Sequence, residues 1–473
     1  MALDNKKNEN FSEWYLELVQ KSELMDYSAV QGCMIFRPAS IFIWERIQEF
    51  LNEKFSVDGV KNAYFPLFIP ESMLSKEAEH FQGFTPEVAW VTRGGNDELG
   101  EKLALRPTSE TVIYSTYAKW VSSYRDLPLK LNQWCNIIRW DTKTLKPFLR
   151  TREFLWQEGH TVHSSEEDAE RMVSRALGWY IDVCKELLAI PVFYGVKSKI
   201  ETFPGAVYTM GIEALMPDGK SLQSGTSHNL GQNFSKMFNL QFKTKDETKE
   251  YGWTTSWGVS TRLIGAVAML HSDDKGLVLP PKIAETQVVI VPIYKTLEDK
   301  KMCVIAANRV VSVLKKQGLR LIIDEREDKT PGFKFNDWEM KGVPLRIEIG
   351  LMDLAKTGVT IARRDTGEKE FVVENEVSGF VESVLQEIQS NLYSKAKALL
   401  DSSVVEVEQL KELKISIEDK KIVKAFCCDS RCEEAVHEES QATSRIVEKA
   451  SAEGKCIICS KPTADLHWFA KAY

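Results

Sequence analysis

The sequence predicts an α+β protein with more than one domain, and three observations support this class. The chain has 473 residues, enough for several domains of about 150 residues each. Residues 130–163 and 220–262 are rich in Trp, Phe, Ile and Thr and are broken by Gly and Pro, which favours strands. Helical segments at 166–188 and 301–317 separate the strand-rich regions. Strands and helices in such runs are typical of α+β proteins.

The first predicted elements are an amphipathic helix at 36–53 and an extended segment at 62–70. The apolar face of this helix carries Ile43, Ile47, Phe50 and Leu51. Two prolines lie in the extended segment, and proline cannot donate a hydrogen bond to a neighbouring strand. We therefore expect a helix that is followed by an edge strand.

A pair of prolines at 280–281 marks the predicted end of the first domain. After this pair, the pattern predicts strands and helices in alternation, with strands at 287–292, 319–324, 345–350 and 358–363 and helices at 301–316 and 382–400. The strand-helix-strand start of the series predicts an α/β domain. The chain thus divides into predicted domains at 1–283, 284–400 and 401–473.

Composition and charge exclude several classes of protein. Apolar residues at 43% and charged residues at 27% are ordinary globular values, which exclude a collagen-like or wholly disordered chain. A net charge of -7 excludes a polycationic nucleic-acid binder, so any nucleic-acid contact needs a local patch. The sequence has no apolar run long enough to predict a membrane span. The polar first ten residues and the cysteines that stand singly predict a cytoplasmic protein.

The last fifty residues hold five of the nine cysteines. Two close groups of cysteines suit a tetrahedral zinc ion with four thiolate ligands. The spacing favours Cys427, Cys432, Cys456 and Cys459 as ligands, with Cys428 as the spare thiol. Because four protein ligands leave no open coordination position, we expect a structural ion. The alternative, five free thiols, leaves the clustering unexplained.

The most informative stretch is a predicted pair of strands at 136–141 and 150–160, joined by an eight-residue loop. Alternate residues of a strand share a face, and one face carries Arg150, Arg152, Phe154, Trp156, Glu158 and His160. One interpretation of this pattern is a solvated hairpin. Aromatic rings beside several arginines favour a ligand platform instead, because they suit stacking and phosphate binding.

The predicted pair of strands resembles a motif of the class II aminoacyl-tRNA synthetases. Arg139 and Asp141 on the first strand, with Arg150 and Phe154 on the second, are similar to motif 2 of that class. Residues 258–262 (GVSTR), which precede an apolar run, resemble motif 3. The helix at 41–55, with the strand that ends at Pro66, resembles motif 1, which builds the dimer interface in that class.

Longer segments narrow the resemblance to the prolyl-tRNA synthetases of the archaeal and eukaryotic-like type. They are RPTSE at 106–110, KLNQW at 130–134, FLRTREFLWQEGH at 148–160, GTSHNLGQ at 225–232 and GFKFNDWEMKGVP at 332–344. The resemblance covers nearly the whole chain, and the order and number of the motifs make it specific.

The resemblance implies an antiparallel-sheet catalytic domain of class II, an α/β anticodon-binding domain and a small zinc-binding C-terminal α/β domain. The implied activity is proline–tRNA ligation, in which proline and ATP with Mg²⁺ form prolyl-adenylate and pyrophosphate and proline then passes to the 3′ end of tRNA(Pro). A homodimer is implied as well. Family members place their zinc ligands at the positions of the four cysteines chosen above. They end in a tyrosine, here Tyr473, whose carboxylate folds back toward the catalytic domain.

For the nucleotide, the resemblance assigns two catalytic arginines, Arg139 and Arg262. Arg139 would bridge the α-phosphate and the proline carboxylate, while Arg150 and Arg262 grip the β,γ end and Phe154 stacks on adenine. Other implied ATP-binding residues are Asp141, Thr151, Glu153, Gln223, Thr226 and Ser260. A planar guanidinium that never loses its proton suits this task. The alternative for Arg262 is a surface salt bridge.

For the amino acid, Glu110 and Thr108 would accept hydrogen bonds from the secondary ammonium of proline, and Arg139 would hold the carboxylate. The pocket walls would be Trp156, Glu158, His160 and His228. A second interpretation makes 108–110 the start of a helix after Pro107, and the two are compatible. The alternative for His160 and for His228, each taken alone, is a structural histidine that binds no substrate.

A pocket for proline discriminates weakly against smaller amino acids, because a missing methylene costs only about 1–3 kcal/mol. We therefore expect misactivation of alanine or cysteine. Residues 159–258 are too few to hold both the scaffold and the editing insertion of bacterial-type relatives, so we expect no editing in cis. Two alternatives stay open: a threonyl- or glycyl-type enzyme, and an inactive synthetase-like RNA-binding or regulatory subunit.

The segment 329–339 interleaves basic and aromatic residues, as single-stranded RNA loops require for stacking and base reading. By resemblance, Glu339 and Arg346 would read guanines of the anticodon. The alternative interpretation is an aromatic strand that packs on the core of the second domain.

Overall fold

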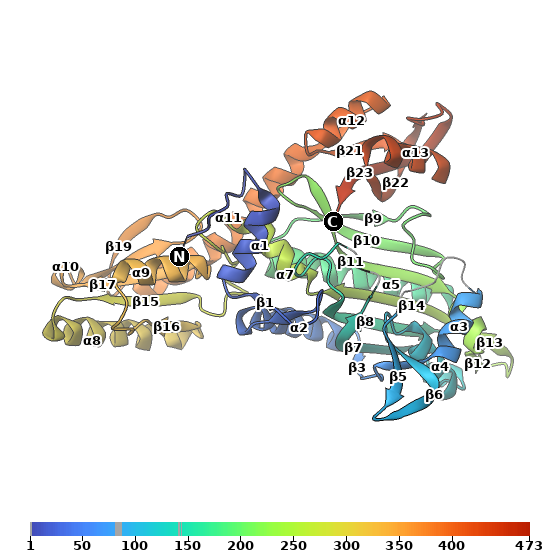
Figure 1. Cartoon of the computed structure of the whole chain (residues 1–473), viewed down its shortest axis with the longest axis horizontal. Helices are drawn as coiled ribbons and strands as arrows, with labels where there is room; N and C mark the ends of the chain where they lie inside the picture. The colour runs from blue at the N-terminus through green and yellow to red at the C-terminus, as the bar shows by residue number, and fades with distance from the viewer. Residues whose placement is uncertain (1, 81–87, 141, 143) are drawn as a thin grey trace.

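The structure is a computed structural model that describes residues 2–80, 88–140, 142 and 144–473. It confirms the α+β class. Figure 1 shows an elongated molecule with a large sheet at one end, a smaller sheet at the other, and the C-terminal elements above the large sheet. In the described part of the chain, no helix has the length and apolar character needed to cross a membrane.

Eleven strands of the described chain form the large sheet. Its catalytic part consists of β3 (Lys61–Asn62), β7 (Leu129–Ile138), β8 (Glu153–His163), β9 (Phe193–Val196), β10 (Tyr208–Leu215), β11 (Lys220–Gly231) and β14 (Trp253–Ser260). The order β9-β10-β11-β14-β8-β7 is antiparallel throughout, as the resemblance implied, and β3 pairs with β7 in parallel at the edge.

Helices bury one face of this sheet. They include α2 (Pro38–Val57), α5 (Glu166–Asp182) with a π-turn at Val183–Leu187, and α7 (Arg262–His271). Phe55 of α2 contacts the rings of Trp134, Trp179 and Trp257. The indole of Trp257 crosses the neighbouring strand at Gly159, where a Cβ atom would lie 2.1 Å from the ring. Gly159 therefore allows the aromatic core to reach the sheet.

Helix α2 lies where the sequence predicts a helix, at 36–53, and it continues one turn further. Pro38 stands in its first turn, a position that proline favours. Ile43, Ile47 and Leu51 are buried as expected, whereas Phe50 is half-buried.

The prediction of one strand over 62–70 is wrong. Only Asn62 belongs to the large sheet, and β4 (Phe68–Pro70) joins a separate sheet with β5 (Trp90–Gly94) and β6 (Asp97–Leu105). Pro66 lies between the two short strands and has no N–H group, so a continuous ladder is interrupted there. The remaining elements of this half of the chain are α1 (Phe11–Lys21), β1 (Met25–Tyr27), β2 (Met34–Phe36), α3 (Glu71–His80), α4 (Glu110–Trp120), a 3-10 turn (Tyr124–Asp126), α6 (Asn233–Phe238), β12 (Gln241–Lys243) and β13 (Lys249–Tyr251).

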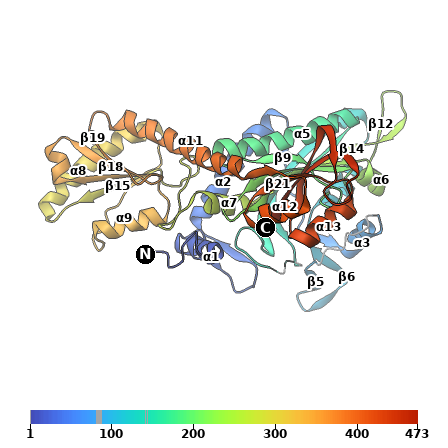
Figure 2. The ribbon, with the colours of Figure 1, turned by 90° about the horizontal axis from the view of Figure 1, so that it is seen from above.

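The second sheet has the order β16-β15-β17-β18-β19. Its elements are β15 (Val288–Ile293), α8 (Leu297–Leu314), a 3-10 turn (Lys315–Gln317), β16 (Leu321–Ile323), α9 (Pro331–Met340), β17 (Leu345–Gly350), α10 (Leu351–Ala355), β18 (Gly358–Arg363), β19 (Lys369–Val373) and α11 (Val377–Ser403). The first three strands are parallel, as the strand-helix-strand pattern predicts. Helix α11 runs back from this sheet and contacts α7 (Figure 2).

The interpretation of 329–339 as an aromatic strand is wrong, because this segment forms α9. The Thr330 side chain caps the helix by accepting a hydrogen bond from the Phe333 N–H, and Pro331 occupies the first helical position. These two residues start the helix, and this local signal outweighs the aromatic content of the segment.

The C-terminal elements extend the catalytic sheet. They are β20 (Val404–Glu406), α12 (Leu410–Glu418), β21 (Ile422–Phe426), α13 (Ser430–Ser440), β22 (Thr443–Lys455) and β23 (Pro462–Ala472). Strand β22 pairs with β9, and β23 pairs with the start of β11. Tyr473 folds back as expected: its N–H donates to the Ser221 carbonyl and its hydroxyl to Asp218 at 2.6 Å. The division at 283 and 400 stays a proposal, and the second boundary falls in the last turn of α11.

Candidate active site

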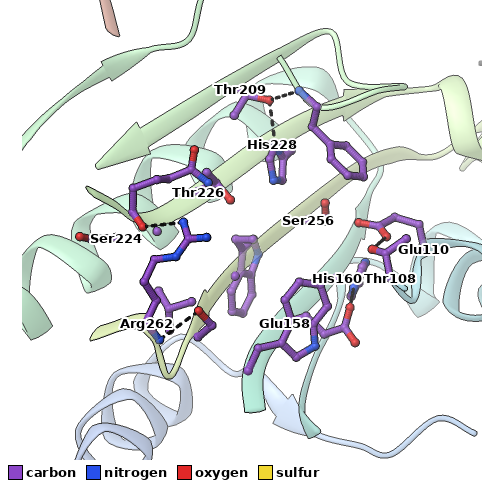
Figure 3. A pocket seen from close by; sticks show the side chains of 18 of the residues that line it. Thr108, Glu110, Glu158, His160, Thr209, Ser224, Thr226, His228, Ser256 and Arg262 are labelled. Carbon is purple, nitrogen blue, oxygen red and sulfur yellow. Dashed lines mark hydrogen bonds and ion pairs between the residues drawn. The ribbon is translucent and has the colours of Figure 1, made fainter. Parts of the chain in front are cut away.

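A cavity of about 320 Å³ opens on the face of the catalytic sheet (Figure 3). Strands β8, β11 and β14, the start of α4 and the loop between β9 and β10 surround it. Its lining is Thr108, Glu110, Arg139, Phe154, Trp156, Glu158, His160, Glu201, Thr202, Phe203, Pro204, Thr209, Gln223, Ser224, Gly225, Thr226, His228, Ser256, Trp257, Gly258, Val259, Ser260 and Arg262.

A second cavity of about 430 Å³ adjoins the first. The two cavities share Arg139, Phe154, Ser260 and Arg262. The rest of the second lining is Thr142, Thr144, Phe148, Leu149, Arg150 and Thr151. The site therefore has two compartments, with two arginines and an aromatic ring at their junction.

The start of α4 supplies the acidic group of the first compartment. Glu110 is buried in the first turn of the helix, where the positive end of the helix dipole favours a carboxylate. The Thr108 hydroxyl donates a hydrogen bond to it. Ser109 occupies the N-cap position but makes no side-chain cap bond, because its hydroxyl donates to Glu158 instead. The helix-start interpretation of 108–110 is thus confirmed, and it leaves Glu110 beside the cavity.

Glu158 is a buried carboxylate that several donors surround. Its Oε1 accepts from the Ser109 hydroxyl and from Gln133 Nε2, both at 2.5 Å, and its Oε2 lies 3.0 Å from His160 Nε2. Burial alone raises the pKa of Glu158, but the hydrogen bonds from His160, Ser109 and Gln133 outweigh it and lower the pKa below its ordinary value. Glu158 therefore stays ionised and fixes the orientation of His160.

His160 is held by this carboxylate on one side only. Burial disfavours its charged form, yet the hydrogen bond that it donates to Glu158 and the charge of Glu110 raise its pKa above the ordinary value. Its Nδ1 is buried and has no hydrogen-bond partner in the described part of the chain. A buried donor or acceptor of this kind, on a cavity wall, is suited to a ligand or a water molecule.

In contrast to His160, His228 has a pKa below the ordinary value. Burial and the positive charges of His160 and Lys197 lower its pKa to about 3, so it is neutral at physiological pH. The Thr209 hydroxyl accepts from the Phe203 N–H, and its oxygen lies 2.8 Å from His228 Nδ1. The ring of Phe203 packs on His228 with centroids 4.7 Å apart. Together they form an apolar wall of the first compartment.

The two arginines at the junction are positioned by backbone carbonyls. Arg139 Nε donates to the Pro107 carbonyl at 3.3 Å, and its guanidinium lies 5.6 Å from the Phe154 ring centre and 5.7 Å from that of Trp156. Arg262 donates to the carbonyls of Leu149 and Gln223, both at 3.2 Å.

No described carboxylate forms an ion pair with Arg262, so the surface salt-bridge alternative is wrong. Burial and the neighbouring charge of Arg139 lower the pKa of Arg262 to about 10. A largely desolvated cation that two carbonyls hold in place, with no ion pair to a described carboxylate, suits an anionic ligand.

Of four further predicted nucleotide residues, two line the second compartment, one lies elsewhere and one lies outside the described residues. Arg150 is exposed at the second compartment and Thr151 is buried there. Glu153 lines neither compartment, because its carboxylate accepts from Asn136 Nδ2 at 2.9 Å. Asp141 lies outside the described residues.

One wall of the site is not among the residues predicted from the sequence. This wall is the loop between β9 and β10, which contributes Glu201, Thr202, Phe203 and Pro204. Pro204 and Gly205, whose φ is +88°, are recognisable as a turn, but nothing local indicates that the turn covers the sheet. Ser256 and Trp257 were not predicted either. Strand alternation from Gly258 and Ser260 indicates Ser256 but not Trp257, whose ring packs against Phe55 on the other face.

The predicted anticodon residues lie side by side. Arg346 donates to Glu339 and to Glu348, each at 3.0 Å, and its guanidinium lies 4.1 Å from the Phe335 ring centre. Both residues line a small depression between α9 and β17.

The cysteine cluster corrects one predicted zinc ligand. The Sγ atoms of Cys428, Cys432, Cys456 and Cys459 lie within 4.8 Å of one another, as four thiolates around one zinc ion require. Cys427 is fully buried in the apolar core of the C-terminal elements. Consecutive residues of an extended segment point to opposite sides, so only one of the two adjacent cysteines reaches the cluster.

Comparisons with known proteins identify all three parts of the chain. A model of the class II tRNA synthetase core domain (G, H, P, S and T) matches residues 90–271. A model of an anticodon-binding domain matches 287–386, and a model of the C-terminal part of prolyl-tRNA synthetase matches 410–473.

Full-length relatives agree with these matches. The proline–tRNA ligase of Natranaerobius thermophilus is 47% identical over 99% of this chain and 97% of its own length. That of Cenarchaeum symbiosum is 48% identical over the whole of both chains. The crystal structure of a prolyl-tRNA synthetase from Cryptosporidium parvum, complexed with halofuginone and AMPPNP, superposes with a TM-score of 0.95 at 43% identity and covers 100% of this chain and 99% of that one. The chain therefore belongs to the prolyl-tRNA synthetase family of class II aminoacyl-tRNA synthetases.

Proposed function

We propose that this protein activates L-proline with ATP and transfers it to tRNA(Pro). The observation that carries the proposal is the two-compartment site, in which Arg139 and Arg262 stand at the junction. A proline carboxylate in the first compartment and a triphosphate in the second would meet at these two cations. The relatives of this chain support the choice of proline.

In the first step, a proline carboxylate oxygen attacks the α-phosphorus of ATP, and the bond to the β-phosphate oxygen breaks, so pyrophosphate leaves. In the second step, a hydroxyl of the terminal tRNA ribose attacks the carbonyl carbon of the adenylate, and AMP leaves. Neither step needs a strong protein base, so positioning and charge neutralisation dominate. ATP enters as its magnesium complex, and the ion neutralises phosphate charge that the arginines do not.

Each compartment has residues that suit its ligand. Arg139 would contact both the carboxylate and the α-phosphate, Arg150 and Arg262 the outer phosphates, and Phe154 the adenine. Further nucleotide contacts are proposed for Thr151, Gln223, Thr226 and Ser260 of the lining, and for Asp141. For the amino acid, Glu110 and Thr108 would accept from the ammonium, while Trp156, Glu158, His160 and His228 enclose the ring.

Pyrophosphate exchange into ATP, measured without tRNA and with each amino acid in turn, tests the activation step. Strong exchange with proline is expected, with a weak signal for alanine or cysteine because a smaller side chain fits the same pocket. Pyrophosphate exchange with threonine or glycine but not with proline would contradict the proposed pocket. No exchange from folded protein would favour the inactive, regulatory alternative.

We also propose that proofreading in cis is lacking. Between 159 and 258 the chain is occupied by strands β9–β14 and helices α5 and α6, which build the catalytic sheet and its cover. Misacylated alanyl-tRNA(Pro) should therefore accumulate in a purified charging assay. Rapid release of alanine from that product by the enzyme alone would contradict this.

We propose a structural zinc ion held by Cys428, Cys432, Cys456 and Cys459, a donor set of four thiolates that suits zinc. Cys428→Ser is expected to lower the zinc content and the thermal midpoint, because metal binding and folding are coupled. Cys427→Ser is the matched control and should keep one zinc per chain. Metal analysis that shows loss only in the Cys427 variant would instead support the ligand set predicted from sequence.

The second sheet is proposed to bind the anticodon through Glu339 and Arg346. Because the two side chains bond each other, Arg346→Met should also release Glu339. The KM for tRNA in charging is expected to rise about tenfold or more, as for the loss of a base-reading arginine, while pyrophosphate exchange stays unchanged. An unchanged KM for tRNA would reject the assignment.

A cytoplasmic homodimer is proposed as the working form. Large side chains with apolar surface are at least half exposed near the N-terminal elements, namely Tyr27, Ile35, Val57 and Tyr64. Such exposed apolar surface suits contact with a partner subunit. Light scattering should give twice the mass of the 53.9 kDa chain.

A further inference from the structure

The loop between β9 and β10 carries one wall of the first compartment, and its own contacts with the rest of the site are few. Glu201, Thr202, Phe203 and Pro204 line the cavity. Within the loop, the Ser198 hydroxyl accepts from the Glu201 N–H at 3.3 Å, and the Ser198 carbonyl accepts from the Thr202 hydroxyl at 2.8 Å. Ser198 thus starts the turn that brings this wall over the sheet.

The C-terminal elements contact this turn through a hydrogen bond from Ser198. Glu433 of α13 accepts a hydrogen bond from the Ser198 hydroxyl at 2.8 Å. Both side chains are buried, at about 5% exposure each, so water cannot readily replace the bond. The same hydroxyl therefore links α13 to the backbone of Glu201, a residue of the cavity wall.

A second contact comes from β22. Arg445 donates to Glu213 Oε1 at 2.8 Å and lies 3.6 Å from Glu201 Oε2. Glu213 also binds Lys197, the residue before Ser198, at 2.5 Å, and the Ser221 hydroxyl at 2.6 Å. Lys197, Glu213 and Arg445 are all buried, so the members of this ion-pair network are strongly coupled.

The two contacts meet the loop at its base and in its first turn. Val447 of β22 pairs with Val196, where the loop leaves β9, and the next residues are Lys197 and Ser198. The far end of the loop is fixed separately by the Thr209 hydroxyl, which binds the Phe203 N–H. The C-terminal elements therefore control where the loop begins, and so where its wall lies.

We propose that Arg445 and Glu433 are positioning residues for the amino-acid compartment: they clamp the loop 197–204 from the C-terminal side and thereby set the affinity for proline. This inference rests on the proposed function, since the wall is assigned to the proline compartment. The second compartment shares no residue with this loop, so we expect the clamp to affect the affinity for ATP much less than the affinity for proline.

The test compares Ser198→Ala and Arg445→Met with two matched controls. Glu433→Gln keeps an acceptor for the Ser198 hydroxyl, and Glu439→Gln lies on the same helix but pairs with the exposed Lys414. In pyrophosphate exchange, the first two variants are expected to raise the KM for proline about tenfold with the KM for ATP within about twofold, because one buried polar contact corresponds to about one such factor. The controls should stay near wild type, and Arg445→Lys should recover part of the affinity.

Two further readouts separate a clamp from a loss of stability. Hydrogen exchange of peptides that cover 197–209 should be faster in Arg445→Met, while exchange in β7 and β8 is unchanged. A double variant, Ser198→Ala with Glu433→Ala, should raise the KM for proline no more than either single change, because both remove the same link.

Three results would overturn the clamp. They are an equal rise in both KM values, an unchanged KM for proline with only a lower thermal midpoint, and unchanged hydrogen exchange in the loop. Failure of wild-type protein to exchange with proline would reject the proposed function instead. Hydrogen exchange would still test the clamp in that case, since it needs no substrate.

Discussion

Arg139→Ala should reduce prolyl-adenylate formation by about 10²- to 10³-fold or more, the usual cost of removing a group that stabilises transition-state charge. Arg139 is the one predicted residue assigned to both substrates, and it lies at the junction of the two compartments between the Phe154 and Trp156 rings. The loss should therefore be mainly in kcat, and the KM values should change less. Single-turnover formation of labelled adenylate measures it.

Two companion variants make this result specific. Arg139→Lys keeps the charge but cannot hold two oxygens with one planar group, so it should also be strongly impaired. Arg171→Ala removes an arginine on α5 whose side chain is 68% exposed, and it should behave as wild type. Thermal midpoints within a few degrees of wild type would show that the fold is intact. Turnover near the wild-type rate in Arg139→Ala would reject the assignment.

Glu110→Gln should weaken proline binding by about 10- to 100-fold, because a hydrogen bond to a charged group is worth about 1.5–3 kcal/mol. The substitution keeps the size of the side chain and removes the charge that faces the proline ammonium. Glu110 is buried and accepts a hydrogen bond from the Thr108 hydroxyl. Among the described residues that line the cavity, it is the carboxylate that α4 supplies. The KM for proline, measured by pyrophosphate exchange, is the readout.

The KM for ATP should be nearly unchanged in Glu110→Gln, since Glu110 does not line the second compartment. Thr108→Val, which removes the bonded hydroxyl, should show a smaller loss in the same direction. An exposed change such as Glu412→Gln on α12 serves as the control. A fall in ATP affinity with no change for proline would reverse the assignment of the two compartments.

Much of the site was predictable because its residues lie on strands with a period of two. Phe154, Trp156, Glu158 and His160 alternate along β8, and the structure places all four on the lining of one cavity. Arg262 follows β14 at the start of α7, where motif 3 places it. Local patterns of this kind specify a face and a register.

What the sequence did not reveal depends on tertiary contacts. The choice between Cys427 and Cys428 is set by which side of the chain faces the other cysteine pair, and spacing alone does not encode it. Glu213 and Arg445 are 232 positions apart and carry no motif. The loop wall at 201–204 is visible in sequence only as a turn, because its place over the sheet is fixed by contacts from other elements.

Charging of tRNA(Pro) with labelled proline, at limiting enzyme and with and without ATP, tests the central claim most directly, because it requires both compartments and the anticodon domain at once. The account predicts ATP-dependent, acid-precipitable proline on tRNA(Pro), abolished by Arg139→Ala and reduced by Arg346→Met. Equal charging of tRNAs with unrelated anticodons, or charging with threonine or glycine in place of proline, would contradict it.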